Sequence, residues 1–169
     1  MNWSSDVKNT LIFQCQWGLC LASAIFPALI GVDKLALMIV MLRLVMQRPS
    51  MMEMMVLMVL VFLGGVHDVL LLHWHVFDFP RHSGWVLPIW LWILWFCFGD
   101  WFLRMLWFRR HRLRTLLFFV LVAPLGYLLG AHWGALYWGS SWFWDALLMG
   151  ISWLVLGFMY DALSNKLRA

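Results

Sequence analysis

The chain has 169 residues, of which 64% are hydrophobic and only 12% are charged. Soluble domains are typically about 45–50% apolar and about 25% charged, so this composition excludes an ordinary soluble protein and predicts an integral membrane protein. The net charge of +4 does not indicate nucleic-acid binding, because the basic residues lie between apolar runs rather than along one polar face. The expected surroundings are the lipid bilayer, and no nucleic acid partner is expected.

Long apolar runs predict six transmembrane helices. A helix rises 1.5 Å per residue, so about 20 apolar residues cross a hydrocarbon layer of about 30 Å. Divided at charged residues, Pro and Gly, the chain contains six such runs, at residues 9–26, 28–47, 52–75, 85–108, 114–137 and 142–164. We therefore predict an all-α, polytopic transmembrane helical bundle that forms a single integral membrane domain over residues 1–169.

The second of these runs is the least regular. Asp33 and Lys34 interrupt its start, and Arg43 lies within it. A five-helix bundle in which this segment is re-entrant is therefore the alternative. The runs are continuously apolar instead of alternating with a period of two, which excludes a β-barrel.

The distribution of Lys and Arg predicts the orientation. Positively charged loops stay in the cytoplasm, and the segment 104–114 carries five arginines. With this loop inside, six spans place ten of the 12 basic residues in or near the cytoplasm and leave only Lys34 and Arg81 outside. Both termini are then cytoplasmic. The same loop is a candidate contact for anionic lipid headgroups.

Ionisable residues inside a bilayer cost roughly 2.5–3.5 kcal/mol each, so each is a candidate for function. Helical spacing places His67 and Asp68 of the third run, His132 of the fifth and Asp145 of the sixth at similar depth, towards the outer surface. No Lys or Arg lies at that depth, so Asp68 must be neutralised by His67, by His132 or by protonation. This polar intramembrane centre is either a cation, proton or substrate site, or a buried carboxylic acid that donates to a carbonyl.

A second polar layer is predicted nearer the cytoplasm. Gln14 and Gln16 on the first run and Asp100 and Arg104 on the fourth lie roughly 10 Å above that surface. Asp100 and Arg104 are four residues apart, so they can neutralise each other on one helix face. This layer is interpreted as structural.

The remaining polar patterns indicate neither a metal nor a cofactor. His73, His75, Asp78 and His82 crowd the end of the third run, but His73 and His75 are two residues apart and point to different faces of a helix. They are interpreted as interfacial histidines. No serine stands in a recognisable pattern with a histidine and an acid, and no glycine-rich phosphate loop follows a strand, so enzymatic activity is not predicted.

Glycines at positions 126, 130 and 134 form a stripe on the fifth run. Small residues spaced by four allow another helix to approach closely in a membrane. The stripe therefore predicts helix packing at Gly126, Gly130 and Gly134.

Several short motifs resemble those of a known family. They are Phe13-Gln14 with Trp17, Gly65 to Asp68, Pro88-Ile89-Trp90, and Pro124-Leu125-Gly126-Tyr127 through Gly130 to Gly134. Together they resemble a family of small multi-pass bacterial inner-membrane proteins described as a domain of unknown function. The resemblance extends over nearly the whole chain. Members of such families are often encoded near enzymes that modify fatty acids and cyclopropane lipids, which implies a lipid-related role.

Two classes of function remain open from the sequence. One is an accessory factor in membrane lipid or fatty-acid modification, with Asp68, His67 and His132 as its polar centre. The other is a small proton- or cation-coupled transporter, or a permease subunit, that uses Asp68 as the carrier. A lateral opening to lipid beside Asp68 favours the first class, and a continuous polar path between the two layers favours the second.

Overall fold

Helices make up almost all of the structure. The computed structural model describes residues 3–80, 84, 86–105, 112–139 and 141–166. In this part of the chain the helices are α1 (Trp3–Ile25), α2 (Asp33–Gln47), α3 (Met51–His73), α4 (Ile89–Arg104), α6 (Arg112–Leu117), α7 (Ala123–His132) and α8 (Trp142–Lys166). A π-helical turn, η2 (Phe118–Val122), joins α6 to α7, so these two form one continuous helix. The described helices are therefore six in number, and the predicted all-α class is confirmed.

The helices begin and end where proline and glycine dictate. Before α2 the chain forms a short 3-10 turn, η1 (Pro27–Leu29), and then passes through Gly31 with a φ of 93°, so α2 begins only at Asp33. α4 begins directly after Pro88, whose backbone is extended. α7 is followed by Gly134, whose φ of 79° is accessible mainly to glycine. These residues make three helices shorter than the apolar runs that predict them.

Two short strands lie at one end of the helices. β1 (Phe77–Asp78) follows α3, and β2 (Tyr137–Trp138) follows α7. They pair in antiparallel fashion, with Phe77 opposite Trp138 and Asp78 opposite Tyr137. This pair is not expected from the sequence, because two-residue strands are too short to show a periodic pattern.

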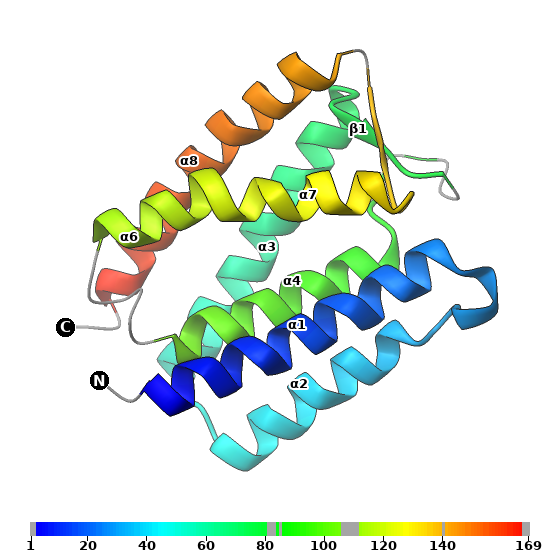
Figure 1. The fold of residues 1–169 in the computed structure, drawn as a ribbon. Helices are drawn as coiled ribbons and strands as arrows, with labels where there is room; N and C mark the ends of the chain where they lie inside the picture. The colour runs from blue at the N-terminus through cyan, green and yellow to red at the C-terminus, as the bar shows by residue number, and fades with distance from the viewer. Residues whose placement is uncertain (1–2, 81–83, 85, 106–111, 140, 167–169) are drawn as a thin grey trace.

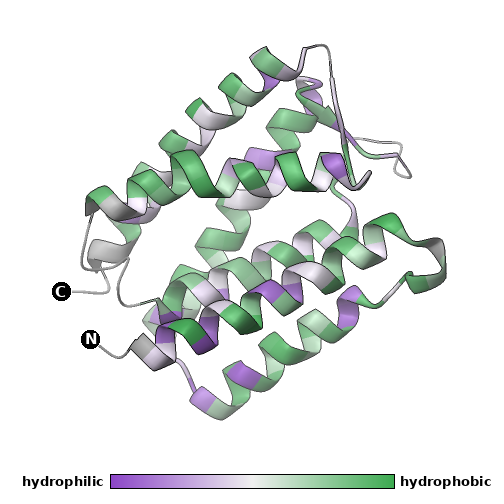
Figure 2. Cartoon of the chain, in the orientation of Figure 1, coloured by the Kyte–Doolittle hydropathy of each residue, from purple (hydrophilic) through white to green (hydrophobic). Residues whose placement is uncertain are grey.

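The helices form two groups that share α3. α1, α2 and α4 pack together, α8 packs beside the helix formed by α6, η2 and α7, and α3 contacts both α4 and α8 (Figure 1). The start of α1 and the end of α8 lie at the same end of the bundle (Figure 1). Apolar residues extend along most of each helix (Figure 2).

Three of the described helical segments are long and apolar enough to cross a membrane: Met51–His73, Thr115–His132 and Trp142–Leu163. α2 and α4 contain 15 and 16 residues and are about 22 and 24 Å long at 1.5 Å per residue. Large apolar side chains are exposed along the bundle, among them Phe62, Leu70 and Val155. A surface of this kind needs a hydrocarbon environment, so the chain is a membrane protein.

Close contact between α3 and α4 depends on glycines. A Cβ atom on Gly64 would collide with the ring of Trp95, and one on Gly65 would collide with the ring of Trp92. The Cβ-free backbone of α3 thus lets two indole rings of α4 lie directly against it. This contact positions Trp95 for its role at the buried polar centre.

Candidate functional site

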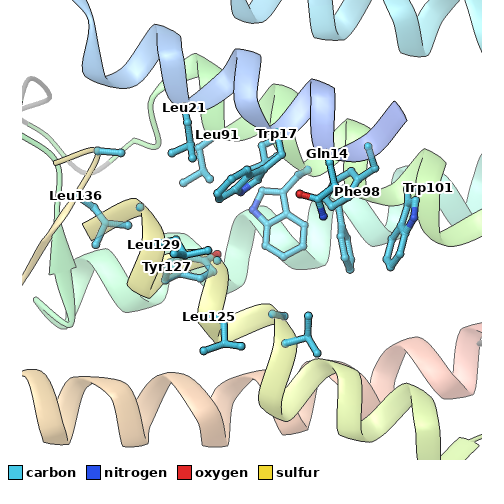
Figure 3. A pocket seen from close by; sticks show the side chains of 18 of the residues that line it. Gln14, Trp17, Leu21, Leu91, Phe98, Trp101, Leu125, Tyr127, Leu129 and Leu136 are labelled. Atoms are coloured by element: carbon cyan, nitrogen blue, oxygen red, sulfur yellow. The ribbon is translucent and has the colours of Figure 1, made fainter. Parts of the chain in front are cut away.

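The main cavity lies between α1, α4 and the helix formed by η2 and α7. It has a volume of about 410 Å³, within the range of about 300–1,000 Å³ that small-molecule sites occupy. Of the 23 described residues that line it, ten are aromatic and none is charged. α1 and α7 lie on opposite sides of the cavity and α4 forms a third side, with side chains from these helices directed towards the space between them (Figure 3).

Residues that line the cavity and are also exposed mark its mouth. On α1 this residue is Gln14, on η2 it is Val122, and on α7 they are Leu125 and Leu129. The mouth therefore lies between α1 and α7, on the side of the bundle. Ring contacts join the helices around the cavity: Trp17 of α1 with Trp133 at the end of α7, at a centroid distance of 5.6 Å, and Trp101 of α4 with Phe118 of η2, at 5.3 Å.

The π-helical turn shapes one wall of this cavity. Pro124 has no backbone N–H, so a regular helix would leave the carbonyl four residues earlier without its donor. The chain widens to a π turn over Phe118–Val122 just before this proline. Phe118 and Val122 both line the cavity, in keeping with the frequent occurrence of π turns at functional sites.

Asp68 lies behind the cavity and has no exposed surface. Trp95 Nε1 donates to its Oδ2 at 2.8 Å, and the Tyr127 hydroxyl donates to its Oδ1 at 2.7 Å. His67 Nδ1 lies 2.9 Å from the same Oδ1 atom. Trp95 and Tyr127 also line the cavity. These two side chains therefore donate to the carboxyl group of Asp68 and at the same time separate that group from the cavity. Helices α3, α4 and α7 therefore meet at Asp68.

His67 extends this network to α8. Its Nε2 atom lies 2.8 Å from Ser152 Oγ, and Ser152 Oγ also donates to the carbonyl of Met149 at 2.8 Å. Aspartate, histidine and serine thus stand in the order of a hydrolase triad, which the sequence analysis did not detect because Ser152 is 85 residues from His67. Ser152 lies in the middle of α8 and is not among the cavity-lining residues. The arrangement is explained as a network that fixes the orientation of the His67 ring.

Three donors surround the carboxyl group of Asp68. With Asp68 as a carboxylate, Trp95, Tyr127 and a His67 Nδ1–H all donate to it, and the single proton of the Ser152 hydroxyl is directed either to the Met149 carbonyl or to His67 Nε2. A carboxylate that accepts several hydrogen bonds is compatible with burial. The polar centre therefore requires no lysine or arginine.

The other residues expected at this centre lie apart from Asp68. His132 is exposed in the last turn of α7, and the residue of that helix that reaches Asp68 is Tyr127. Asp145 is buried, and its Oδ2 accepts from the backbone N–H of Ser141 at 3.1 Å at the start of α8. Nothing in the sequence marked Trp95 or Ser152, whereas Tyr127 stood within one of the family-like motifs.

The second polar layer contains an ion pair between helices that the sequence analysis did not predict. Arg104 Nε donates to Asp100 Oδ1 at 2.8 Å on α4, and Arg43 Nε of α2 lies 3.1 Å from Asp100 Oδ2. Arg43 Nη2 also donates to Asn9 Oδ1 of α1 at 2.8 Å. The Asp100 carboxylate and Arg43 together thus connect α4, α2 and α1.

The two glutamines expected in this layer have different environments. Gln16 is buried, and its Nε2 donates to the carbonyl of Ala36 on α2 at 3.3 Å. Gln14 is exposed at the mouth of the cavity. The layer therefore includes one packing residue and one residue that a cavity ligand can reach.

The glycine stripe does not form the close helix contact that its spacing predicts. A Cβ atom on Gly126 would meet nothing within 4 Å, and Gly134 lies beyond the end of α7. At Gly130 the nearest atoms are Leu136 Cδ2 at 3.6 Å and Leu21 Cδ2 at 3.9 Å, which are ordinary contacts. The reason is that Gly126 and Gly130 face the cavity instead of a neighbouring helix.

The remaining candidates are only partly within the described structure. His75 Nδ1 lies 3.5 Å from Asp78 Oδ2 on the surface, and His73 is at the end of α3. His82 and residues 106–111 of the basic loop lie outside the described residues. Within the described ranges, no three His, Cys, Asp or Glu side chains are grouped closely enough to hold a metal ion.

Comparison with known protein families assigns the chain to one family. Residues 6–158 match a family described as protein of unknown function (DUF2878). The match covers most of the 169 residues, and the chain belongs to this family. The chain has no significant similarity to a curated protein or to a solved structure.

Proposed function

We propose that this protein binds the hydrocarbon chain of a membrane lipid in the cavity between α1 and α7, and acts as an accessory factor in membrane lipid or fatty-acid modification. The observation that carries the proposal is an aromatic cavity without charged lining residues whose mouth lies on the side of the bundle. An apolar chain entering it leaves one hydrocarbon environment for another and gains contacts with the aromatic walls.

The proposal includes a location and a topology. The protein is a multi-pass protein of the bacterial inner membrane, with six spans and both termini in the cytoplasm. In that orientation α1 and α7 are lipid-facing neighbours, so the mouth between them opens into the bilayer rather than into water. The strongly biased distribution of Lys and Arg supports this orientation.

A proton- or cation-coupled transporter would need a polar path between the two polar layers. Gly99, which is adjacent to Asp100 on α4, packs on Leu57 of α3, so Leu57 marks the depth of the second polar layer. Leu57 is 11 residues before Asp68, so the two layers are about 16 Å apart at 1.5 Å per residue. Within the described structure, the rings of Trp95, Phe98 and Trp101 follow one another along α4 between the layers, with centroid distances of 5.6 and 5.7 Å. Aromatic packing of this kind favours the lipid function over transport.

Quenching of tryptophan fluorescence provides the test. Trp17, Trp90, Trp95, Trp101 and Trp153 all line the cavity, so a bound brominated acyl chain lies within quenching distance of five indoles. We expect a brominated fatty-acid ester to quench the purified protein saturably, and the unbrominated ester to reverse this quenching.

A pair of glycine variants makes the test specific to the cavity. Gly126→Leu places a side chain in the open cavity, whereas Gly150→Leu on α8 also meets open space but lies outside the lining residues. Loss of saturable quenching in Gly126→Leu alone supports the proposal. Equal quenching in both variants shows that the chain binds elsewhere and overturns it. Lipid analysis of a deletion strain then tests the role in modification, because an unchanged lipid composition contradicts an accessory function.

A further inference from the structure

We propose that the lipid bound in the cavity carries an uncharged hydroxyl group, which donates a hydrogen bond to Tyr127 Oη and accepts one from Gln14. The inference rests on the proposed lipid-binding function and specifies the chemical class of the ligand. It follows from the hydroxyl and amide groups of the cavity and from how each of them is already bonded.

The lining excludes a charged group inside the cavity. Among the described residues that line it there is no Lys, Arg, His, Asp or Glu, and Asp68 is completely covered by its neighbours. An ion without a partner in such surroundings is strongly disfavoured. A phosphate or carboxylate headgroup therefore stays outside, and only a neutral part of the ligand enters.

Tyr127 presents an acceptor to the cavity. Its hydroxyl proton points to Asp68 Oδ1 at 2.7 Å, and Asp68 is held in place by Trp95 and His67. A phenolic oxygen whose proton is engaged in this way retains lone pairs that can accept a hydrogen bond. The matching ligand group is a donor, and the neutral donor that a lipid chain or its end most simply offers is a hydroxyl group.

Gln14 supplies the complementary donor on the opposite wall. Its side chain is directed towards the cavity from α1, and Tyr127 lines the same cavity from α7 (Figure 3). Its carboxamide has no hydrogen-bond partner among the residues that the structure describes. A carboxamide both donates and accepts, so it can engage the ligand oxygen while the ligand proton is directed to Tyr127.

The third hydroxyl or amide side chain of the lining is already engaged. Thr10 Oγ1 accepts from Trp101 Nε1 at 3.3 Å and donates to Met105 Sδ at 3.9 Å. Among the hydroxyl and amide side chains of the lining, this leaves Gln14 and Tyr127 as the pair that distinguishes a hydroxyl-bearing chain from a plain hydrocarbon. The lining also contains the buried indole N–H of Trp153, which has no hydrogen-bond partner in the described structure and is a further donor for a ligand oxygen.

Competition between lipids tests the inference on the full chain in detergent. The probe is a brominated fatty-acid methyl ester, which quenches the tryptophan fluorescence of the protein. The competitors are an alkane, a methyl ester and a primary alcohol of equal chain length. One or two neutral hydrogen bonds correspond to an advantage of roughly 3- to 10-fold, so the alcohol is expected to displace the probe at correspondingly lower concentration than the alkane.

Three variants locate the preference. Gln14→Leu and Tyr127→Phe are expected to reduce the advantage of the alcohol to about one while retaining alkane binding. Tyr137→Phe, on the exposed strand β2 outside the lining, should retain the full advantage. Gln14→Leu keeps the test valid if Tyr127→Phe weakens the fold, because Gln14 contributes no hydrogen bond to the described structure.

The outcomes separate this inference from the proposed function. If alkane and alcohol compete equally in the parent protein, the hydroxyl inference is wrong while lipid binding stands. An alcohol preference that persists in Gln14→Leu overturns the assignment of the site. If no competitor displaces the probe, both the lipid-binding proposal and this inference are wrong.

Discussion

The indole of Trp95 on α4 donates to the carboxyl group of Asp68 on α3 at 2.8 Å, and the same ring lies against the bare backbone of Gly64. The two relationships depend on each other. Gly64 is one helical turn before Asp68, so the absence of a side chain there lets the ring approach closely enough to reach the carboxyl group. A glycine of α3 thus sets the geometry of a polar network in α4, α7 and α8.

Replacing Gly64 by Ala should destabilise the protein. The new Cβ would overlap the Trp95 ring, and both the ring and the Asp68 hydrogen bond would have to move. Overpacking of this kind typically costs about 1–3 kcal/mol. Thermal unfolding in detergent measures the change, with Gly150→Ala as the control because a Cβ there meets nothing within 4 Å. Equal melting temperatures for the two variants would show that α3 and α4 are not packed as described.

Replacing Asp68 by Asn tests the protonation state of the polar centre. Asn keeps one acceptor oxygen but turns a second acceptor into an NH₂ donor, which would face Trp95, Tyr127 or His67. An unsatisfied buried group costs about 1–3 kcal/mol, so the melting temperature should fall. Asp78→Asn is the control, since its side chain is 52% exposed. If Asp68→Asn melts like the parent, Asp68 is a neutral acid that donates a hydrogen bond, and the carboxylate description is wrong.

The six helices could be predicted because long apolar runs and their Pro and Gly breaks are local properties of the sequence. The partners of the polar residues could not. Asp68 bonds to Tyr127, which is 59 residues away in the sequence, and Asp100 pairs with Arg43, which is 57 residues away. Periodicity within one helix places a residue on a face but does not identify the helix opposite that face.

The glycines illustrate the same limit. Gly126 and Gly130 are spaced as in a helix-packing stripe, yet they face a cavity. Gly64 and Gly65 are adjacent, which is not the spacing of such a stripe, yet both are overlaid by indole rings. Whether a small residue adjoins a ring, a backbone or open space depends on the tertiary arrangement, which the spacing alone does not determine.

Removing the carboxyl group of Asp100 should destabilise the inner layer strongly. The side chains of Arg43 and Arg104 are only 10% and 14% exposed, and Asp100→Ala would leave both near each other without this anion. Breaking a buried ion pair in this way costs about 3–5 kcal/mol. Asn9→Ala, which removes only one hydrogen bond to Arg43, should cost about 0.5–1.5 kcal/mol. The two variants are compared by thermal unfolding, and equal losses would mean that Asp100 contributes little to holding α2 against α4.

The topology prediction follows from charge and geometry together. One end of the bundle contains the start of α1 and the last turns of α2, α4 and α8 (Figure 1). The start of α2, which includes Lys34, lies at the opposite end (Figure 1). Arg48 and Arg104 also belong to the first end, so the positively charged end should be cytoplasmic.

Green fluorescent protein fused after Ala169 should therefore fluoresce, and alkaline phosphatase inserted at Ser140, between β2 and α8, should be active in the periplasm. Exchanging the two reporters is the control, since each should then be silent. Active phosphatase at Ala169 would place the carboxyl terminus outside. This result would contradict six spans with both termini inside and would favour the alternative bundle of five spanning helices.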